Sequence, residues 1–314
     1  LERNAMSVRV RFAPSPTGQV HIGNIRTAIF NYLFARHENG QFLLRVEDTD
    51  RERSNEAAVK GVLDAMEWLG LDVDEEPMYQ STRTEAHLAV AQDLLDRGLA
   101  YKADKGDTGK GEAIIFRMPE GSLHFVDVLK GELTKSSEDV QDLVIVRSNG
   151  APVFHLANVV DDIEMGITHV IRGDDHIENT YRHVALYEAL GAPVPSFCHL
   201  PMIVNQHGKP YSKRDGSAFV GEFRETGYLP DAFLNYLSLL GWSPGDDLEV
   251  MDRQRLIDLF SLERIRSSAS QMDMKKLMWM NGEFMRALSR ADSALSELFL
   301  EICFVTTADY AGAL

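Results

Sequence analysis

Hydrophobic positions near the start of the chain change from a strand pattern to a helix pattern and back. Val8 to Phe12 is a short β-branched segment that ends just before Pro14, which is typical of a strand. From His21 to Arg36 the apolar residues recur three and four positions apart, so this segment predicts a helix. Phe42 to Val46 predicts a second strand. The order strand, helix, strand indicates a βαβ unit, and therefore a parallel sheet.

The segments that follow depart from this alternation. Helices are expected from Ser54, as the N-cap, to Leu69 and from about Arg83 to Arg97. The region after Leu99 is predicted to hold a polar loop and then three short strands, at Lys102–Gly111, Ile114–Met118, Leu123–Leu129 and Leu143–Arg147. We therefore interpret residues 78–152 as an insertion into an α/β domain.

The α/β pattern returns in the second half of the chain. Segments of α/β type are expected in the order strand, strand, helix, strand, at Val153–Leu156, Thr168–Arg172, Asn179–Leu190 and Phe197–Val204. From Pro230 onward the pattern predicts helices only, at Asp231–Leu240, Asp252–Phe260 and Asp273–Phe284. The predicted fold class is α/β, with a parallel-sheet domain from residues 6–77 and 153–205 and a helical domain from residues 206–314.

Composition and charge narrow the classes of protein that fit. The 314 residues include 32 Lys and Arg against 48 Asp and Glu, a net charge of −16, which argues against a protein that coats nucleic acid non-specifically. Cys198 and Cys303 cannot form a disulfide framework, so a reducing, intracellular compartment is expected. No apolar run is long enough to span a membrane. Leu1 to Ala5 precede Met6, and we interpret them as a remnant of an expression vector.

A candidate phosphate site lies where the first predicted helix begins. Residues 13–18 contain two prolines and a glycine, and so form a turn that cannot continue a strand or a helix. The free N–H groups and the positive dipole end of the helix that follows favour a phosphate. Gly23 would let a nucleotide approach the backbone, and His21 would donate a hydrogen bond to a phosphate oxygen. The alternative is a capping region with an incidental histidine.

A second cationic segment lies between Gly208 and Gly216. It contains Ser212-Lys213-Arg214, and glycines at both ends are typical of a mobile loop. Such a loop can close over a triphosphate and supply positive charge as the transition state forms. An exposed polar turn without function is the alternative, and on this motif alone it is the more common case.

Polar side chains also follow the expected strands, at the sheet edge where ligands bind in open α/β folds. Glu47 follows the second strand, and a carboxylate there could hold an ammonium group or belong to a solvated turn. The segment from Asn158 to Asp162 is open to the same two interpretations. Six further histidines between His155 and His207 show no zinc spacing, so structural or surface roles are expected for them.

Two arginines occupy positions where apolar residues are usual. Arg11 lies inside the first strand, and a semi-buried arginine needs an anionic partner, either a structural carboxylate or a ligand. Arg172 follows an apolar strand and either pairs with Asp174 or Asp175 or binds an anionic ligand. Spacing alone does not decide between these alternatives.

Taken together, the motifs resemble the glutamyl-tRNA synthetases, a family of class I aminoacyl-tRNA synthetases. The resemblance extends from about Val8 to Glu283 and includes counterparts of the family's HIGH and KMSKS elements. The matching segments are Arg11–Gly18, His21–Asn24, Phe30–Arg36, Arg45–Arg51, His155–Asp162, Val170–His176 and Ser212–Arg214.

This resemblance implies roles for individual residues. Arg11 and Arg172 resemble the pair that binds the side-chain carboxylate of glutamate, where two guanidinium groups penalise a neutral amide. The other implied glutamate contacts are Glu47 at the α-ammonium group, Asn158 at the α-carboxylate, and Ser15 and Phe154. His21 and Lys213 are the expected catalytic residues. The implied ATP contacts are Thr17, Gly18, His21, Gly23, Asn24, Ser212, Lys213 and Arg214.

Three positions depart from the family pattern. Phe154 stands where the family has a tyrosine, so one phenol hydrogen bond is absent, and Asn24 ends the HIGH element. Pro210 replaces the first lysine of the KMSKS element, which stiffens the loop.

The resemblance also implies a reaction, cofactors and partners. ATP and Mg²⁺ would convert L-glutamate to glutamyl-adenylate, and the glutamyl group would pass to tRNA(Glu). Residues 6–77 and 153–205 would form a Rossmann-type catalytic domain, residues 78–152 an acceptor-end-binding domain, and residues 206–314 a stem-contact domain that stops before the anticodon-binding region. A cytoplasmic monomer without membrane contact is expected. No zinc site is expected, because the segment Tyr101–Asp104 lacks the cysteines of zinc-binding members.

Three alternatives stay open at this point. A glutamyl-queuosine tRNA(Asp) synthetase is favoured by the short chain, whereas the helices from Met251 to Glu283 resemble those of glutamyl enzymes. A glutaminyl-tRNA synthetase fits the turn at residues 13–18 less well. A catalytically silent tRNA-binding homologue would explain Pro210 and Phe154.

Overall fold

The computed structural model describes residues 7–49, 56–104 and 111–291. The predicted βαβ unit is confirmed: β1 (Arg9–Phe12), α1 (Ile22–His37) and β2 (Gln41–Val46) follow in order, and the two strands pair in parallel, with Arg11 opposite Leu43. The short strand β3 (Met78–Tyr79) pairs in parallel with the other edge of β2.

A second group of strands continues this sheet. β9 (His169–Gly173) and β10 (Ser196–Leu200) pair in parallel, and β6 (Ser122–Asp127) and β7 (Gly131–Ser136) extend the order to β7-β6-β10-β9. β9 lies beside β1, where the backbone N–H of Thr168 donates to the carbonyl of Arg9 at 2.9 Å. The fold is therefore α/β with parallel strands, as the sequence predicts.

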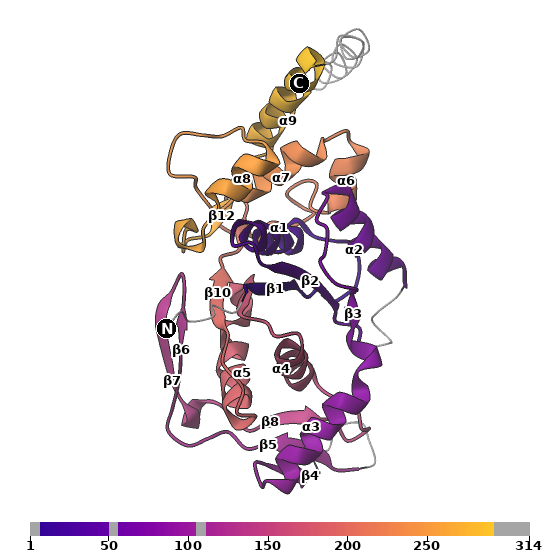
Figure 1. Ribbon diagram of the computed structural model, residues 1–314, viewed down its shortest axis with the longest axis vertical. Coiled ribbons are helices and arrows are strands. Elements are labelled where there is room, and N and C mark those ends of the chain that lie inside the picture. The colour runs from indigo at the N-terminus through magenta and orange to yellow at the C-terminus, as the bar shows by residue number, and fades with distance from the viewer. Residues whose placement is uncertain (1–6, 50–55, 105–110, 292–314) are drawn as a thin grey trace.

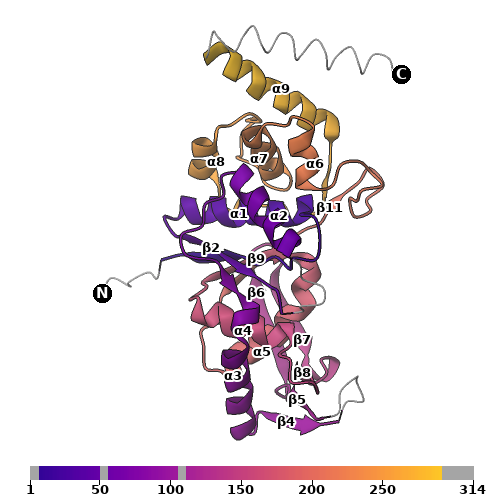
Figure 2. The ribbon, with the colours of Figure 1, turned by 90° about the vertical axis from the view of Figure 1, so that its right-hand side faces the viewer.

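Helices cover both faces of these strands (Figure 1). α1 packs against β1, β2 and β9 on one face, and its other side contacts α7 (Pro230–Leu239) and α8 (Arg253–Leu259). α4 (Phe154–Glu164) and α5 (Ile177–Ala189) pack together on the opposite face, and α2 (Glu56–Trp68) lies near α1 in both views (Figure 2). Each face consequently has its own hydrophobic core.

Residues 78–152 supply a small antiparallel sheet at one end of the molecule (Figure 1). It has the order β4-β5-β8, from β4 (Ala100–Ala103), β5 (Ala113–Phe116) and β8 (Leu143–Val146), and α3 (Thr84–Asp96) packs on it. β3 and β6 belong to the same stretch of sequence but pair with strands of the parallel sheet. The segment is thus joined to that sheet by backbone hydrogen bonds at two places.

The opposite end of the molecule is mainly helical (Figure 1). It contains α6 (Val220–Glu225), α7, α8 and α9 (Met274–Ala291), together with the two-residue strands β11 (Ile203–Val204) and β12 (Ser270–Gln271).

Short 3₁₀ turns lie in several parts of the molecule, at Gln80–Thr82, Ser137–Asp139, Asp174–His176 and Leu262–Arg264. Within the described residues, no helix is both long enough and apolar enough to cross a bilayer.

Several sequence predictions were wrong in detail. Val153–Leu156 is not a strand: Val153 is the extended N-cap residue of α4, and the helix begins at Phe154. The expected strand Phe197–Val204 is two strands, because the chain leaves the sheet at Pro201, which has no N–H to donate. The prediction of helices only after Pro230 missed β12, and the hairpin strand β7 was not predicted.

Other predictions met mixed outcomes. Lys102 lies in strand β4 and not in a loop. The proposed N-cap Ser54, most of the Lys102–Gly111 loop, the remnant at Leu1–Ala5 and Cys303 lie outside the described residues. Helices α1, α3, α7 and α8 begin and end close to their predicted bounds, whereas α9 begins as predicted but continues to Ala291, past the predicted end at Phe284.

Candidate active site

Three arginines point from neighbouring strands toward the same face of the parallel sheet. On β2, Phe42, Leu44 and Val46 join the core beneath α1, whereas Leu43 joins the core beneath α4 and α5. Because side chains alternate along a strand, Arg45 shares the face of Leu43. The same alternation applies on β1 and β9, and it places Arg11 and Arg172 on the α4 and α5 side as well.

Helix α4 supplies the anion that two of these arginines share. Arg11 donates to both oxygens of Asp162, from Nε to Oδ1 at 2.9 Å and from Nη2 to Oδ2 at 3.2 Å. Arg45 donates from Nη1 to Oδ1 of the same carboxylate, and Tyr187 of α5 donates to its Oδ2 at 3.3 Å. Burial opposes ionisation of Asp162, but Arg11 and Arg45 outweigh it and lower the pKa of this carboxyl to about 2. Arg11 therefore has a structural partner, one of the two alternatives left by its sequence.

Glu47 lies at the carboxyl end of β2, and two candidate residues contact it. Asn158, one helical turn before Asp162 on α4, donates from Nδ2 to Oε1 at 2.9 Å, and Ser15 donates from Oγ to Oε2 at 3.2 Å. Arg45 lies 3.6 Å from Oε1. Burial raises the pKa of Glu47, while the Arg45 and Arg11 cations oppose this. Oδ1 of Asn158 is buried and has no hydrogen-bond partner in the described part of the chain, so it can accept a further hydrogen bond.

Arg172 differs from Arg11 because it is held by neutral groups. Its Nη2 donates to Oγ1 of Thr180 at 2.6 Å, its Nη1 contacts Nδ1 of His183 at 3.3 Å, and its Nε donates to Nε2 of His199 at 3.3 Å. Asp174 and Asp175 are not partners, and among the described residues no carboxylate forms an ion pair with this guanidinium.

Burial and charge together favour an anionic ligand beside Arg172. Burial lowers the pKa of Arg172 to about 10, and the nearby Arg11 cation contributes in the same direction. Its side chain is only 7% exposed. A buried cation without a counter-ion is costly, and a carboxylate ligand would relieve that cost.

Phe154 forms one wall of this region. Its ring lies 5.2 Å from that of His155, 5.7 Å from that of His183 and 6.0 Å from that of His176, between ring centroids. Burial lowers the pKa of His155 and of His176 to about 4, and Arg172 contributes to both shifts. Sequence analysis assigned no function to most of the histidines. The structure brings four of them close to Arg172, namely His155, His176, His183 and His199.

The predicted phosphate site is built around the N-terminus of α1. His21 is the N-cap residue, and its Nδ1 accepts from the backbone N–H of Gly23 at 3.1 Å. Nδ1 is therefore an acceptor, which makes Nε2 the nitrogen that carries the hydrogen. Burial lowers the pKa of His21, and a hydrogen bond between the ring and the backbone of Tyr211 opposes this shift. Thr17, Gly18 and Asn24 are exposed around it, and a Cβ on Gly18 would meet no atom within 4 Å.

The cationic loop lies beside this helix terminus. The ring of Phe219, just after the loop, contacts the ring of His21 edge-on, with 6.0 Å between centroids. Lys213 lies over the same Phe219 ring, with Nζ 5.8 Å from its centroid. Nζ of Lys213 also lies 3.7 Å from Glu222 of α6. Lys213 is 71% exposed and Arg214 is exposed, so both are free to turn toward a ligand, whereas Ser212 donates to Asp215 at 3.0 Å.

The protein itself offers no metal cage in its described part. Across residues 7–49, 56–104 and 111–291, no three side chains of His, Cys, Asp or Glu gather in a way that could hold a metal ion. Mg²⁺ commonly binds proteins through substrate phosphates and few side chains. The donor set therefore fits an ion carried by a nucleotide better than a resident one.

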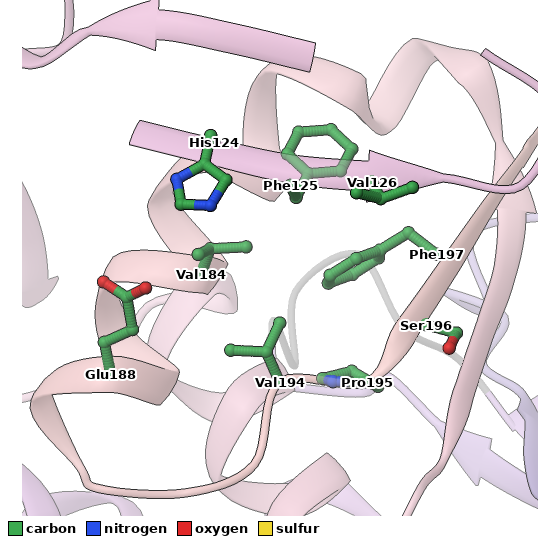
Figure 3. Close-up of a pocket in the computed structure, with 9 residues that line it drawn as sticks. All are labelled: His124, Phe125, Val126, Val184, Glu188, Val194, Pro195, Ser196 and Phe197. Carbon is green, nitrogen blue, oxygen red and sulfur yellow. The ribbon is translucent and has the colours of Figure 1, made fainter. Parts of the chain in front are cut away.

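A pocket of about 300 Å³ lies elsewhere, between β6, β10 and α5 (Figure 3). Phe125 and Phe197 line it, and the ring of Phe197 stacks on His199 with 6.0 Å between centroids. The lining contains none of the residues that the sequence singled out. This pocket is therefore separate from the candidate active site and lies behind the shell that holds Arg172.

Sequence reasoning missed several members of the site. Arg45, Thr180, His183 and His199 received no role, and Asp162 was left between two interpretations. A charged residue inside the apolar strand Phe42–Val46 was the available signal for Arg45. No comparable signal marks Thr180 or His199, because their importance comes only from tertiary contact with Arg172.

Comparison with known proteins identifies the family of this chain. A family model described as the catalytic domain of class I tRNA synthetases (E and Q) matches residues 7–109 and 103–279. The chain is 47% identical over 313 residues to the glutamate–tRNA ligase of Xylella fastidiosa (strain M23), covering 90% of this chain and 67% of that protein. It is 44% identical over 325 residues to the glutamate–tRNA ligase of Synechococcus sp. (strain JA-3-3Ab), covering 91% of this chain and 68% of that protein.

Solved structures lead to the same family. A glutamate tRNA ligase from Elizabethkingia meningosepticum CCUG26117, crystallised in complex with its amino acid, superposes with a TM-score of 0.85 at 32% identity, covering 90% of this chain and 70% of that one. A glutamate-tRNA synthetase from Elizabethkingia anophelis gives 0.86 at 32% identity, covering 96% and 74%. This chain therefore belongs to the class I tRNA synthetases of the E and Q type, whose catalytic domain it contains.

Proposed function

We propose that the chain ligates L-glutamate to tRNA(Glu) at the expense of ATP. The relatives named glutamate–tRNA ligase support this function over the alternatives of a glutamyl-queuosine synthetase and a silent tRNA-binding homologue. The single observation that carries the proposal is the buried guanidinium of Arg172, which has no carboxylate partner among the described residues and lies beside Arg11.

The glutamate side chain would lie between Arg172 and Arg11. A γ-carboxylate supplies the anion that Arg172 lacks, whereas a glutamine amide would place an N–H donor against a guanidinium. Glu47 would accept from the α-ammonium group, and the Nδ2 group of Asn158, which has a second N–H beside the one that donates to Glu47, would donate to the α-carboxylate. Ser15 and Phe154 complete this proposed set.

The phosphates of ATP would bind at the N-terminus of α1. An oxygen of the glutamate α-carboxylate attacks the α-phosphorus, the bond from that phosphorus to the bridging oxygen breaks, and pyrophosphate leaves with the electron pair. Nε2 of His21, the helix N–H groups and Lys213 would stabilise the charge that develops on the phosphates. Mg²⁺ bound to the nucleotide would supply further neutralisation. Thr17, Gly18, Gly23, Asn24, Ser212 and Arg214 are the remaining proposed ATP contacts.

The second half-reaction transfers the glutamyl group to tRNA. A hydroxyl of the terminal adenosine attacks the carbonyl carbon of the adenylate, and AMP leaves. Residues 78–152 would bind the acceptor end, and residues 206–314 would contact the stem. We also propose that the protein is a cytoplasmic monomer. Residues 6–77 and 153–205 would form a catalytic domain of the Rossmann type.

A pyrophosphate-exchange assay tests the proposal. Purified protein is given ATP, ³²P-pyrophosphate and glutamate, with or without tRNA(Glu), and charging of tRNA(Glu) with ¹⁴C-glutamate is measured in parallel. Charging together with exchange that depends on tRNA is the expected result. Exchange without tRNA would favour the queuosine-type enzyme, and no exchange or charging under any condition would favour the silent homologue.

A further inference from the structure

Arg172 and His199 are neighbours by sheet register. They are directly paired residues of the parallel strands β9 and β10, and both side chains point to the α4 and α5 face. The Nε–H of Arg172 donates to Nε2 of His199 at 3.3 Å, and the His199 side chain is completely buried. Strand pairing therefore fixes the distance between the two side chains before any ligand binds.

Asp127 holds His199 from the opposite side. It is the last residue of β6, and its Oδ2 accepts from Nδ1 of His199 at 2.7 Å and from the backbone N–H of His199 at 3.0 Å. Its Oδ1 accepts from the backbone N–H groups of Leu129 and Lys130, each at 2.9 Å. The Asp127 carboxylate is thus fixed by the strand and by the turn that follows it.

This arrangement decides which nitrogen of His199 carries the hydrogen. A carboxylate only accepts, so Nδ1 must be the donor to Asp127. In a neutral imidazole Nε2 then carries a lone pair, which faces Nε of Arg172 at 3.3 Å and the hydroxyl oxygen of Thr180 at 2.9 Å. Burial lowers the pKa of His199, in keeping with a neutral ring beside a guanidinium.

The shell also leaves a defined part of the guanidinium unused. A guanidinium has five N–H groups, two on each terminal nitrogen and one on Nε. His199, His183 and Thr180 each take one, on Nε, Nη1 and Nη2 respectively. One N–H remains on each terminal nitrogen, which is the number that a bidentate carboxylate requires.

We propose that Asp127 and His199 are positioning residues for amino-acid selection: they hold Arg172 by a neutral acceptor, so that its charge and two N–H groups stay available for the γ-carboxylate. Had a carboxylate held Arg172 directly, as Asp162 holds Arg11, the guanidinium would be neutralised before the substrate arrived. The inference rests on the proposed function, and it gives a specificity role to a residue of β6, in the segment 78–152.

Two substitutions of His199 separate positioning from packing. His199→Asn places an amide N–H where Nδ1 lies and keeps the donor to Asp127, but it removes the acceptor for Arg172. His199→Gln places an amide oxygen near Nε2 and keeps an acceptor for Arg172. Both variants create similar vacancies in the core, so a merely structural role predicts similar effects. Glutamate and ATP dependence are measured by tRNA-dependent pyrophosphate exchange, with thermal unfolding in parallel.

We expect His199→Asn to raise the KM for glutamate about tenfold or more, the effect of one lost hydrogen bond to a charged group, with the KM for ATP nearly unchanged. Its preference for glutamate over glutamine should fall by a similar factor. His199→Gln should recover most of both values. Equal effects of the two variants, or an equal rise in the KM for ATP, would overturn the proposal.

A second pair of variants covers the case in which neither His199 variant folds. Thr180→Ser keeps the hydroxyl that accepts from Arg172, and Thr180→Val removes it at nearly constant volume. Only the valine variant should lose glutamate affinity, and loss in both would contradict the proposed shell. Wild-type protein without any glutamate-dependent exchange would instead mean that the proposed function itself is wrong.

Discussion

Asp162 shows how single buried charges organise this site. It is 2% exposed, and Arg11 and Arg45, at 3% and 0%, both depend on it for charge compensation. Moving ions out of water costs several kcal/mol each, and only close pairing offsets that cost. Glu47, 3.6 Å from Arg45, is a second anion beside these two cations, so Arg172 is the cation whose charge no carboxylate ion pair balances among the described residues.

Removal of this carboxylate should therefore be severe. We expect Asp162→Asn to lower the free energy of unfolding by about 3–5 kcal/mol, because two buried guanidinium groups lose their shared partner. Urea unfolding followed by circular dichroism measures the change. Lys60→Ala is the matched control, since it breaks an exposed ion pair with Asp64 at 2.6 Å and should cost less than about 0.5 kcal/mol. Comparable losses in the two variants would contradict this account of Asp162.

The sequence predicted the need for such a partner but not its identity. An arginine inside a strand has to meet an anion, and this followed from Arg11 alone. Asp162 was one of several acidic residues in the chain, and the choice among them depends on the packing of α4 over β1 and β2. The neutral shell of Arg172 was beyond prediction for the same reason: its members come from β10 and α5 and meet only in the folded protein.

At the scale of elements, the connection from α1 to β2 depends on one glycine. The backbone N–H of Gly40 donates to the carbonyl of Ala35 at 2.8 Å, and the backbone N–H of Gln41 donates to the carbonyl of Val8, the residue just before β1, at 2.8 Å. A Cβ at Gly40 would overlap the carbonyl oxygen of Val8 and come 2.8 Å from its Cβ. Since both obstacles lie at or next to the backbone of Val8, the sheet itself would have to shift.

Two glycine substitutions should consequently change the free energy of unfolding in opposite directions. Gly40→Ala should lower the free energy of unfolding by about 2–3 kcal/mol, as overpacking at an unyielding position does. Gly61 lies inside α2, where a Cβ would meet no atom within 4 Å, so Gly61→Ala should raise stability by about 0.5–1 kcal/mol. Chemical denaturation of both proteins measures the difference. Destabilisation by Gly61→Ala, or a neutral Gly40→Ala, would refute the packing argument.

Helix α4 shows where element prediction failed. Its first residues, Phe154 to Leu156, follow the extended residue Val153, and their apolar character was interpreted as a strand. A short apolar run cannot be assigned to a strand or a buried helix by pattern alone. The misassignment had a functional consequence, because only a helix places Asn158 and Asp162 one turn apart and facing the same strands.

At the scale of the whole molecule, the site concentrates groups whose protonation depends on folding. Besides His199, three histidines around Arg172 have depressed pKa values: burial lowers those of His155 and His176 to about 4, and that of His183 lies well below its usual value. Below pH 6.5 the unfolded chain binds protons at these rings and the folded protein does not, down to about pH 4. Because the unfolded state binds more protons, stability falls as the pH falls through this window, and Asp162 adds a further loss between about pH 4 and pH 2.

The free energy of unfolding should therefore decrease steadily from pH 6.5 to pH 4, with a slope of at most about 1.4 kcal/mol per pH unit for each histidine. His155→Asn should make the slope shallower, because Asn cannot titrate and its amide oxygen still accepts from Nε2 of His183, as Nδ1 does now at 3.1 Å. Urea titrations at half-unit pH intervals measure both proteins. If the His155→Asn profile coincides with that of the wild type, His155 is already protonated in the folded protein, and the neutral environment described for Arg172 would not extend to this ring.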